Sequence, residues 1–529
     1  MPRTSADATR LHPPPSLCVL DRLPRTAANA ERGRNEIRIW IQRELAPYLH
    51  QRVATLASAI GSLHFGCYSK EPAHRGDSPM TRLRRDVPRR RFLRSQIVLG
   101  AALATSHRRG ETATRPGAPA KSVIILLQEG GMSQLESWDP KPAAPAEIRG
   151  SFQSIGTRST GFRIGEHMPR LAQQAALYNV VRSVYMDNAR RDHSPGLHWV
   201  LTGYDNQAAG VSLEKVNRFP SVGAVVAHQL GATTSTGLPN FVAIPNARQL
   251  GNRVCYTRPL HLGAACDAFD SGAVPETTMG GYRLPAGLTL PADISRRRLR
   301  QRRELLASLG HRGTSTEGQS TGDKFNAFRE TSYKLLAGQQ GQYAFDLNRE
   351  PQRVREMYGP SAMGQGTLLA RRLVEAGVSC VLVNYSKNNS WDTHTNNFKT
   401  LKDTLLPPMD QAASALLMDL QQRGMLDEVL VLMMGEMGRT PKVNKESGRD
   451  HWPDVFSLMI AGGGLTRGQV LGSSTRHSET PRNRPVHYHE ILATLYHQLG
   501  IAPDHVVDDG LGRPVRIMPE AEPIHELLA

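Results

Sequence analysis

Two kinds of apolar pattern alternate along the chain. Short unbroken apolar runs, typical of parallel strands buried on both faces, cover residues 122–127, 180–184, 241–244, 378–385, 429–434 and 456–461. The segments expected to be helices cover 168–178, 221–230, 365–376, 406–420 and 490–499. Strands that alternate with helices indicate an α/β fold, with three αβα layers and a mainly parallel central sheet covered by helices on both faces.

The run at 429–434 is followed by charged side chains. Beyond Gly435, the charged or metal-capable residues are Glu436, Arg439, Arg449, Asp450 and His451. Ligand sites in open α/β sheets lie at the carboxyl ends of strands, so this stretch is the first candidate for an active site. The alternative is structural: Glu436 and Arg439 form a salt bridge that closes a loop, and Asp450 caps a turn.

Other expected strands lead to similar residues. These residues are Glu129, Ser133, His193, Asp392 and His394. Because the carboxyl ends of parallel strands meet at one edge of a sheet, we expect most of these side chains to converge there with those that follow the run at 429–434. Asp392 can instead form an Asx turn at a helix entry.

Charge is unevenly distributed along the chain. The 529 residues have a formal charge of +17, of which residues 1–120 account for +12 and residues 121–529 for +5. The basic run at 296–303 is expected to be an exposed, solvated helix. The excess positive charge therefore belongs mainly to the N-terminal leader, and nucleic-acid binding is not expected.

The leader contains the pattern of a twin-arginine export signal. Within residues 89–104, Arg89 and Arg90 precede Phe92 and a short apolar run that ends in small residues. That run is too short for a permanent membrane span. We therefore expect a periplasmic or secreted protein that is exported in the folded state.

The signal begins late in the sequence. Met80 starts an ordinary signal, so residues 1–79 are interpreted as an over-long N-terminal extension; the alternative is a genuine amphipathic helix over 37–60. The expected organisation is completed by the signal and linker at 80–120, one large domain at 121–515 and a C-terminal tail at 516–529.

The five cysteines do not have zinc-ribbon spacing. Cys255 and Cys266 are close enough in sequence to close a small disulfide loop in an oxidising compartment. Cys380 lies in an apolar run and is expected to be a core thiol.

Five motifs occur together in the expected domain. They are Gly130-Gly-Met-Ser-Gln134, Asp139-Pro-Lys-Pro142, Trp391-Asp-Thr-His394, Gly435-Glu-Met-Gly-Arg-Thr-Pro441 and Gly448-Arg-Asp-His-Trp452. With them, residues 120–515 resemble the bacterial family called domain of unknown function 1501. The segment from His193 to Gly203, the strand end at Gly435 and the last helix also resemble sulfatases, which belong to the alkaline-phosphatase-like superfamily. The resemblance implies that superfamily's fold.

The chain departs from the sulfatases where their chemistry begins. The position of their formylglycine nucleophile is occupied by His193, and the arginine of the same motif is replaced by Leu197. Formylglycine chemistry is therefore excluded. Ser194 or Ser133 can offer a hydroxyl group, but the sequence identifies no base beside either.

The resemblance also implies a divalent metal site. The candidate ligands are Glu129, His193, Asp392, His394, Glu436, Asp450 and His451. A mixed set of oxygen and nitrogen donors suits zinc or manganese better than calcium. The candidate catalytic residues are His193, Glu436, Arg439 and His451, and the candidate substrate-binding residues are Arg439, Arg449 and Ser133.

Two classes of function follow. The first is a metal-dependent hydrolase of phosphate, sulfate or related esters, with an anionic ester or polysaccharide as substrate. The second is an exported binding or structural protein that keeps the fold without turnover.

Overall fold

The part of the chain that the structure describes is built on a nine-stranded sheet. The structure is a computed structural model that describes residues 118–529 apart from 188–190, 206–218, 247–256, 280, 286–287, 292, 311–328, 330–331, 337, 387–388 and 510. These residues belong to the unit Ala104–Ala529. The expected export signal, the start at Met80 and Cys255 lie outside the described residues.

The sheet is mainly parallel, as predicted. In spatial order its strands are β12 (Val470–Leu471), β4 (Tyr178–Tyr185), β11 (Phe456–Gly462), β8 (Val429–Met434), β1 (Ser122–Leu127), β7 (Cys380–Asn384), β5 (Phe241–Ile244) and β6 (Phe269–Asp270), and β15 (Val486–His487) also pairs with β4. Only the two pairings of β11, with β4 and with β8, are antiparallel among those of the described sheet. The carboxyl ends of β1, β4, β7 and β8 therefore meet at one edge.

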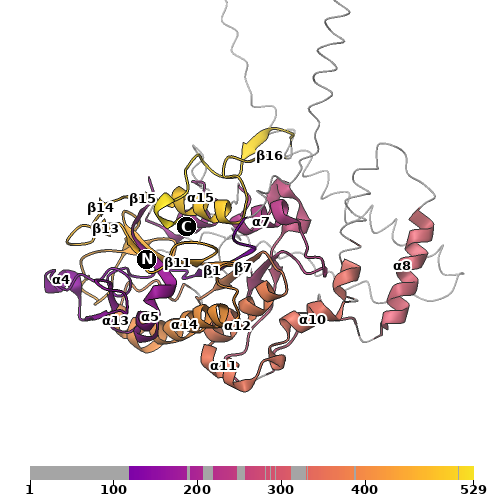
Figure 1. The fold of residues 1–529 in the computed structure, drawn as a ribbon, viewed down its shortest axis with the longest axis horizontal. Helices are drawn as coiled ribbons and strands as arrows, with labels where there is room; N and C mark the ends of the chain where they lie inside the picture. Colours follow the sequence, from indigo (N-terminus) through magenta and orange to yellow (C-terminus); the bar gives the residue numbers. More distant parts are fainter. Residues whose placement is uncertain are drawn as a thin grey trace, which may run out of the picture. The chain divides into compact units, whose positions relative to one another are not determined.

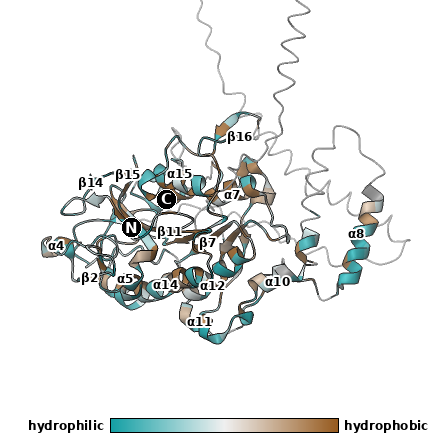
Figure 2. Cartoon of the chain, in the orientation of Figure 1, coloured by the Kyte–Doolittle hydropathy of each residue, from teal (hydrophilic) through white to brown (hydrophobic). Residues whose placement is uncertain are grey.

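Helices cover both faces of the sheet (Figure 1). One face is covered by α5 (Pro169–Gln173), α12 (Ala362–Glu375) and α14 (Leu406–Gln422), and the other by α6 (His193–Thr202), α7 (Val222–Leu230) and α15 (Tyr488–Gln498). In β1, Ile124 and Leu126 belong to the first core, whereas Val123 and Ile125 belong to the second. This alternation explains why the strands are apolar throughout, and Figure 2 shows their hydrophobic colour.

Most expected elements are confirmed, with small shifts at their ends. The expected strands at 122–127, 241–244 and 429–434 are found with those bounds. The helix expected at 168–178 is split into α5 and a 3₁₀ turn at Ala175–Leu177. Helix α6 was not expected from the sequence.

Smaller elements complete the described chain. They are α4 (Ala146–Arg149), β2 (Ser154–Gly156), β3 (Arg163–Gly165), α8 (Arg296–Gly310), α10 (Gln339–Phe345), α11 (Gln352–Tyr358), α13 (Asn397–Thr400), β9 (Gly438–Arg439), β10 (His451–Trp452), β13 (Ser473–Ser474), β14 (Pro481–Asn483), β16 (Val506–Asp508) and β17 (Pro514–Arg516). A π-helical segment, Leu401–Leu405, leads into α14. In the expected tail, Ile517, Met518, Ile524 and Leu527 are buried in the second core.

A buried ion pair joins two loops at the carboxyl edge. Arg449, on the loop before β10, contacts Glu136, on the loop after β1, through Nη2 and Oε1 at 2.6 Å, and neither side chain is exposed. Nη1 donates to the backbone carbonyls of Thr440 and Pro441, Nη2 also donates to the carbonyl of Ile148, and Nε donates to the Glu136 carboxylate. The pair therefore fixes both loops.

Replacing Glu136 by Gln should destabilise the protein strongly. The substitution leaves the charge of Arg449 buried without its carboxylate, which costs about 3–5 kcal/mol in comparable pairs. The measurement is the free energy of unfolding in denaturant. Glu520→Gln, in the exposed pair with Arg516, is the matched control and should change stability little. Equal stability of the two variants would contradict the structural role of the buried pair.

Candidate metal centre

Three side chains from distant parts of the chain converge at the carboxyl edge of the sheet. His193, Asp392 and His451 each offer one ligand atom, and these atoms lie within 4.8 Å of one another. Asp392 is central: its carboxylate oxygens lie 2.9 Å from His193 Nε2 and 3.1 Å from His451 Nε2. His394 joins them, with Nε2 3.0 Å from the same carboxylate.

All three histidines are oriented in the same way. Nδ1 of His193 lies 2.6 Å from Glu436 Oε1, and Nδ1 of His394 lies 2.6 Å from Asp450 Oδ1. Nδ1 of His451 donates to the carbonyl of Arg191 at 2.8 Å. Metal-binding histidines nearly always donate their second ring N–H to a carboxylate or a carbonyl in this manner.

The orientation directs nitrogen lone pairs into one small space. When Nδ1 carries the proton of a neutral ring, Nε2 presents a lone pair, and the Nε2 atoms of His394 and His451 are only 3.0 Å apart. Facing lone pairs repel unless a proton or a cation lies between them. Ligands of a tetrahedral metal at 2.0–2.1 Å are about 3.3 Å apart, so the observed 3.0 Å matches either a shared proton or a bound divalent cation.

Arg439 holds the central carboxylate from the buried side. Its Nη2 donates to Asp392 Oδ1 at 2.6 Å and to the carbonyl of Gly130, and its Nε donates to the carbonyl of Gly131 at 2.9 Å. Nη1 donates to the carbonyl of Arg449 at 3.2 Å. With none of its side chain exposed, Arg439 is arranged to position Asp392.

Charge and burial act on this group in opposite directions. Burial works to lower the pKa of His193, but hydrogen bonds with Asp392 and Glu436 raise it to about 9. For Asp392, burial works to raise the pKa, yet the hydrogen bonds of His193 and His451 and the charge of Arg439 hold it well below its usual range. The carboxylate is therefore ionised and available to a cation.

Local backbone features bring these residues together. Strands β9 and β10 form an antiparallel pair in which His451 lies opposite Arg439. Gly130 has φ +113°, and a Cβ there would lie 2.4 Å from the backbone nitrogen of Asp392. A Cβ at Gly448 would lie 1.7 Å from the carbonyl oxygen of His394. Both positions require glycine because the loops pass so closely.

The other candidate residues lie outside this cluster. Ser133 donates to Glu136, the partner of Arg449, so Ser133 and Arg449 belong to the buried loop anchor. Glu129 is buried beside β7, where it accepts a hydrogen bond from Asn384 at 3.0 Å. None of these three belongs to the group that offers metal ligands among the described residues.

Two contributors to the site were missed in the reasoning from sequence. Gln134 accepts from the backbone N–H of Arg439 and donates to its carbonyl, both at 2.9 Å. Its place in the Gly130–Gln134 motif was a signal for this role. The carbonyl of Arg191 that holds His451 has no signature, because any residue supplies one.

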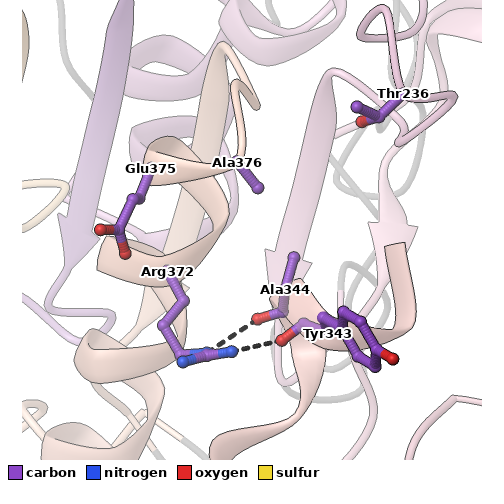
Figure 3. Close-up of a pocket in the computed structure, with 6 residues that line it drawn as sticks. All are labelled: Thr236, Tyr343, Ala344, Arg372, Glu375 and Ala376. Atoms are coloured by element: carbon purple, nitrogen blue, oxygen red, sulfur yellow. Dashed lines mark hydrogen bonds between the residues drawn. The ribbon is translucent and has the colours of Figure 1, made fainter. Parts of the chain in front are cut away.

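A hollow in the surface lies away from the cluster. It has a volume of about 400 Å³ and is lined by Thr236, Tyr343, Ala344, Arg372, Glu375 and Ala376 (Figure 3). Thr236 precedes β5 and Ala376 precedes β7, so the hollow lies at the amino edge of the sheet. It therefore takes no part in the cluster.

The chain has distant similarity to several solved structures. The chain is similar to the PsFucS1 sulfatase from Pseudoalteromonas sp., with 12% identity, coverage of 78% of this chain and 72% of that chain, and a TM-score of 0.31. It is also similar to a protein in the alkaline phosphatase superfamily from Vibrio parahaemolyticus, with 12% identity, coverage of 77% of this chain and 75% of that chain, and a TM-score of 0.32. The third structure is the phosphonate monoester hydrolase SpPMH from Silicibacter pomeroyi, with 11% identity, coverage of 73% of this chain and 74% of that chain, and a TM-score of 0.32.

Three further findings concern curated relatives, membrane-spanning helices and the family of the chain. No curated protein matches it. None of the helices in the described part has both the length and the apolar content to cross a bilayer. Residues 120–528 match the family described as "Protein of unknown function (DUF1501)", and the chain therefore belongs to that family.

Proposed function

We propose that the protein is an exported, metal-dependent hydrolase of phosphate, sulfate or related esters. One observation carries the proposal: three imidazoles, each held at Nδ1 by an oxygen, direct Nε2 toward one carboxylate. A divalent cation bound there supplies Lewis acidity and activates water for attack. The departure from formylglycine chemistry at His193 is consistent with water as the nucleophile.

The residues have separate roles in this proposal. His193, Asp392 and His451 hold the cation, with His394 as a fourth donor beside them. Glu436 and Asp450 accept the Nδ1 protons of His193 and His394 and so fix the orientation of the two rings. Arg439 positions Asp392 instead of binding substrate, because its donors are engaged by protein oxygens. Zinc or manganese suits this donor set better than calcium.

A non-catalytic binding protein is the second candidate. The observation in its favour is that the guanidinium groups of Arg439 and Arg449 are both buried and bonded to the protein. Neither can clamp an anionic ester, although both were candidates for that role. Such a protein would keep the metal as a structural or ligand-binding element.

His193→Gln should remove the metal. The protein as purified is analysed for bound elements and then reloaded with zinc or manganese. We expect a loss of metal affinity greater than the roughly 10–100-fold typical of changes to residues behind a ligand. His198→Gln is the matched control, since His198 lies on the same helix but bonds the carbonyl of Tyr204 at 2.8 Å. Equal metal content in both variants would remove the proposed centre.

Glu436→Gln should reduce turnover without unfolding the protein. Glu436 accepts the Nδ1 proton of His193 and the backbone N–H of Gly130, and glutamine keeps the shape but loses the charge. On a panel of phosphate and sulfate esters, we expect activity that depends on the metal and falls about 10–100-fold in the variant. Exposed Glu479→Gln serves as the control. If the loaded parent hydrolyses none of the esters but binds a polysaccharide or protein through this site, the second candidate is correct.

Export through the twin-arginine route is a separate proposal. Arg89 and Arg90 precede the apolar run of the leader. Replacing both by Lys should leave the protein in the cytoplasm, as measured by cell fractionation. The parent should behave likewise in a strain that lacks the twin-arginine system, and normal export there would contradict the proposal.

A further inference from the structure

Helix α8 (Arg296–Gly310) has an unusual concentration of positive charge. Arginine occupies positions 296, 297, 298, 300, 302 and 303, and Glu304 is the only acidic residue of the helix. All six arginines are exposed. Solvated helices ordinarily carry both signs of charge on their surface, so an exposed helix of nearly one sign needs a physical explanation.

The electrostatics within α8 oppose its own formation. Arg296 and Arg300, and likewise Arg298 and Arg302, are four residues apart, a spacing at which like charges destabilise a helix. The first turn contains Arg296, Arg297 and Arg298 and no acid, so it adds positive charge to the positive end of the helix dipole. Anions at this helix would relieve both effects.

Packing of α8 within the domain does little to offset this electrostatic repulsion. From Arg296 to Ser308 only Leu299 is partly buried, and the other side chains are exposed. Leu305 is 60% exposed and Leu306 is 39% exposed. Figure 2 shows the hydrophilic colour of α8 interrupted by hydrophobic bands. A fifteen-residue helix with so little burial is only marginally stable in water.

We propose that α8 binds the surface of a membrane containing anionic phospholipids. Leu299 and Leu306 lie two turns apart on one side, and Arg302 lies between that side and Leu305. Leucines interleaved with arginines can enter the boundary between head groups and acyl chains while the guanidinium groups bind phosphates. A soluble polyanion such as DNA would use the arginines but leave the leucines exposed. This site is independent of the metal centre.

The test measures binding of the full-length protein to vesicles by sedimentation. Vesicles of phosphatidylcholine are compared with vesicles that also contain phosphatidylglycerol. Each arginine near an anionic surface adds about fivefold in affinity, so Arg296→Gln/Arg297→Gln/Arg300→Gln should weaken binding about 100-fold. The control removes the same charge elsewhere through Arg258→Gln/Arg513→Gln/Arg516→Gln, at exposed positions of the domain.

All variants share the basic leader, so the ratio of their affinities reports on α8. Binding that is equal in the two triple variants would overturn the proposal. Circular dichroism and metal content check that the variants remain folded.

A second variant distinguishes a bilayer from a soluble polyanion. Leu305→Ser/Leu306→Ser should weaken binding to vesicles at least tenfold, because the apolar contribution is lost. It should leave retention on DNA or dextran sulfate unchanged, because the arginines remain. If the double variant binds vesicles as tightly as the parent does, α8 is a general anion site and the membrane proposal is wrong.

Discussion

The contact between Arg439 and Asp392 is the interaction on which the carboxyl edge of the sheet depends. A buried guanidinium needs a counter-charge, and Asp392 provides it at 2.6 Å while the remaining donors take backbone carbonyls from the loop after β1 and from Arg449. The same carboxylate is the meeting point of three imidazoles. One ion pair thus sets the position of loops that come from three strands. Burial makes this arrangement costly unless each polar atom has a partner, which explains the dense bonding around it.

The strands and helices of the central fold could be predicted from sequence because a buried strand appears as an unbroken run of apolar residues. Strand β8, buried on both faces, reads as six apolar residues in succession, and its bounds were predicted without error. Helix α6 was not predicted because Ser194, Pro195 and Gly196 are typical of a turn. Proline is tolerated there because the first turn of a helix has no use for that N–H. The direction of β11 could not be predicted from the local sequence pattern either, since the same apolar run can form a parallel or an antiparallel strand.

The site was predictable by residue type and place, but not by role. Seven candidates, His193, Asp392, His394, Glu436, Arg439, Asp450 and His451, do come together at the edge. Which nitrogen of each ring faces the centre depends on hydrogen bonds to partners far along the chain, such as Glu436, 243 residues beyond His193. Arg449 is similar: its partner Glu136 is 313 residues away, so its burial could not be read from the surrounding sequence. The candidate ligands and the residues that orient them are therefore far apart in the sequence, and local patterns do not show which residues pair.

The antiparallel direction of β11 has a mechanical consequence. Only Pro453, Asp454 and Val455 separate β10, which carries His451, from β11 in the middle of the sheet. A parallel strand would have needed a crossover of about a dozen residues, whose slack could absorb movement. Here, a displacement of His451 would act almost directly on the hydrogen bonds that β11 makes with β4 and β8. The position of His451 is therefore linked to the middle of the sheet by a connection of only three residues.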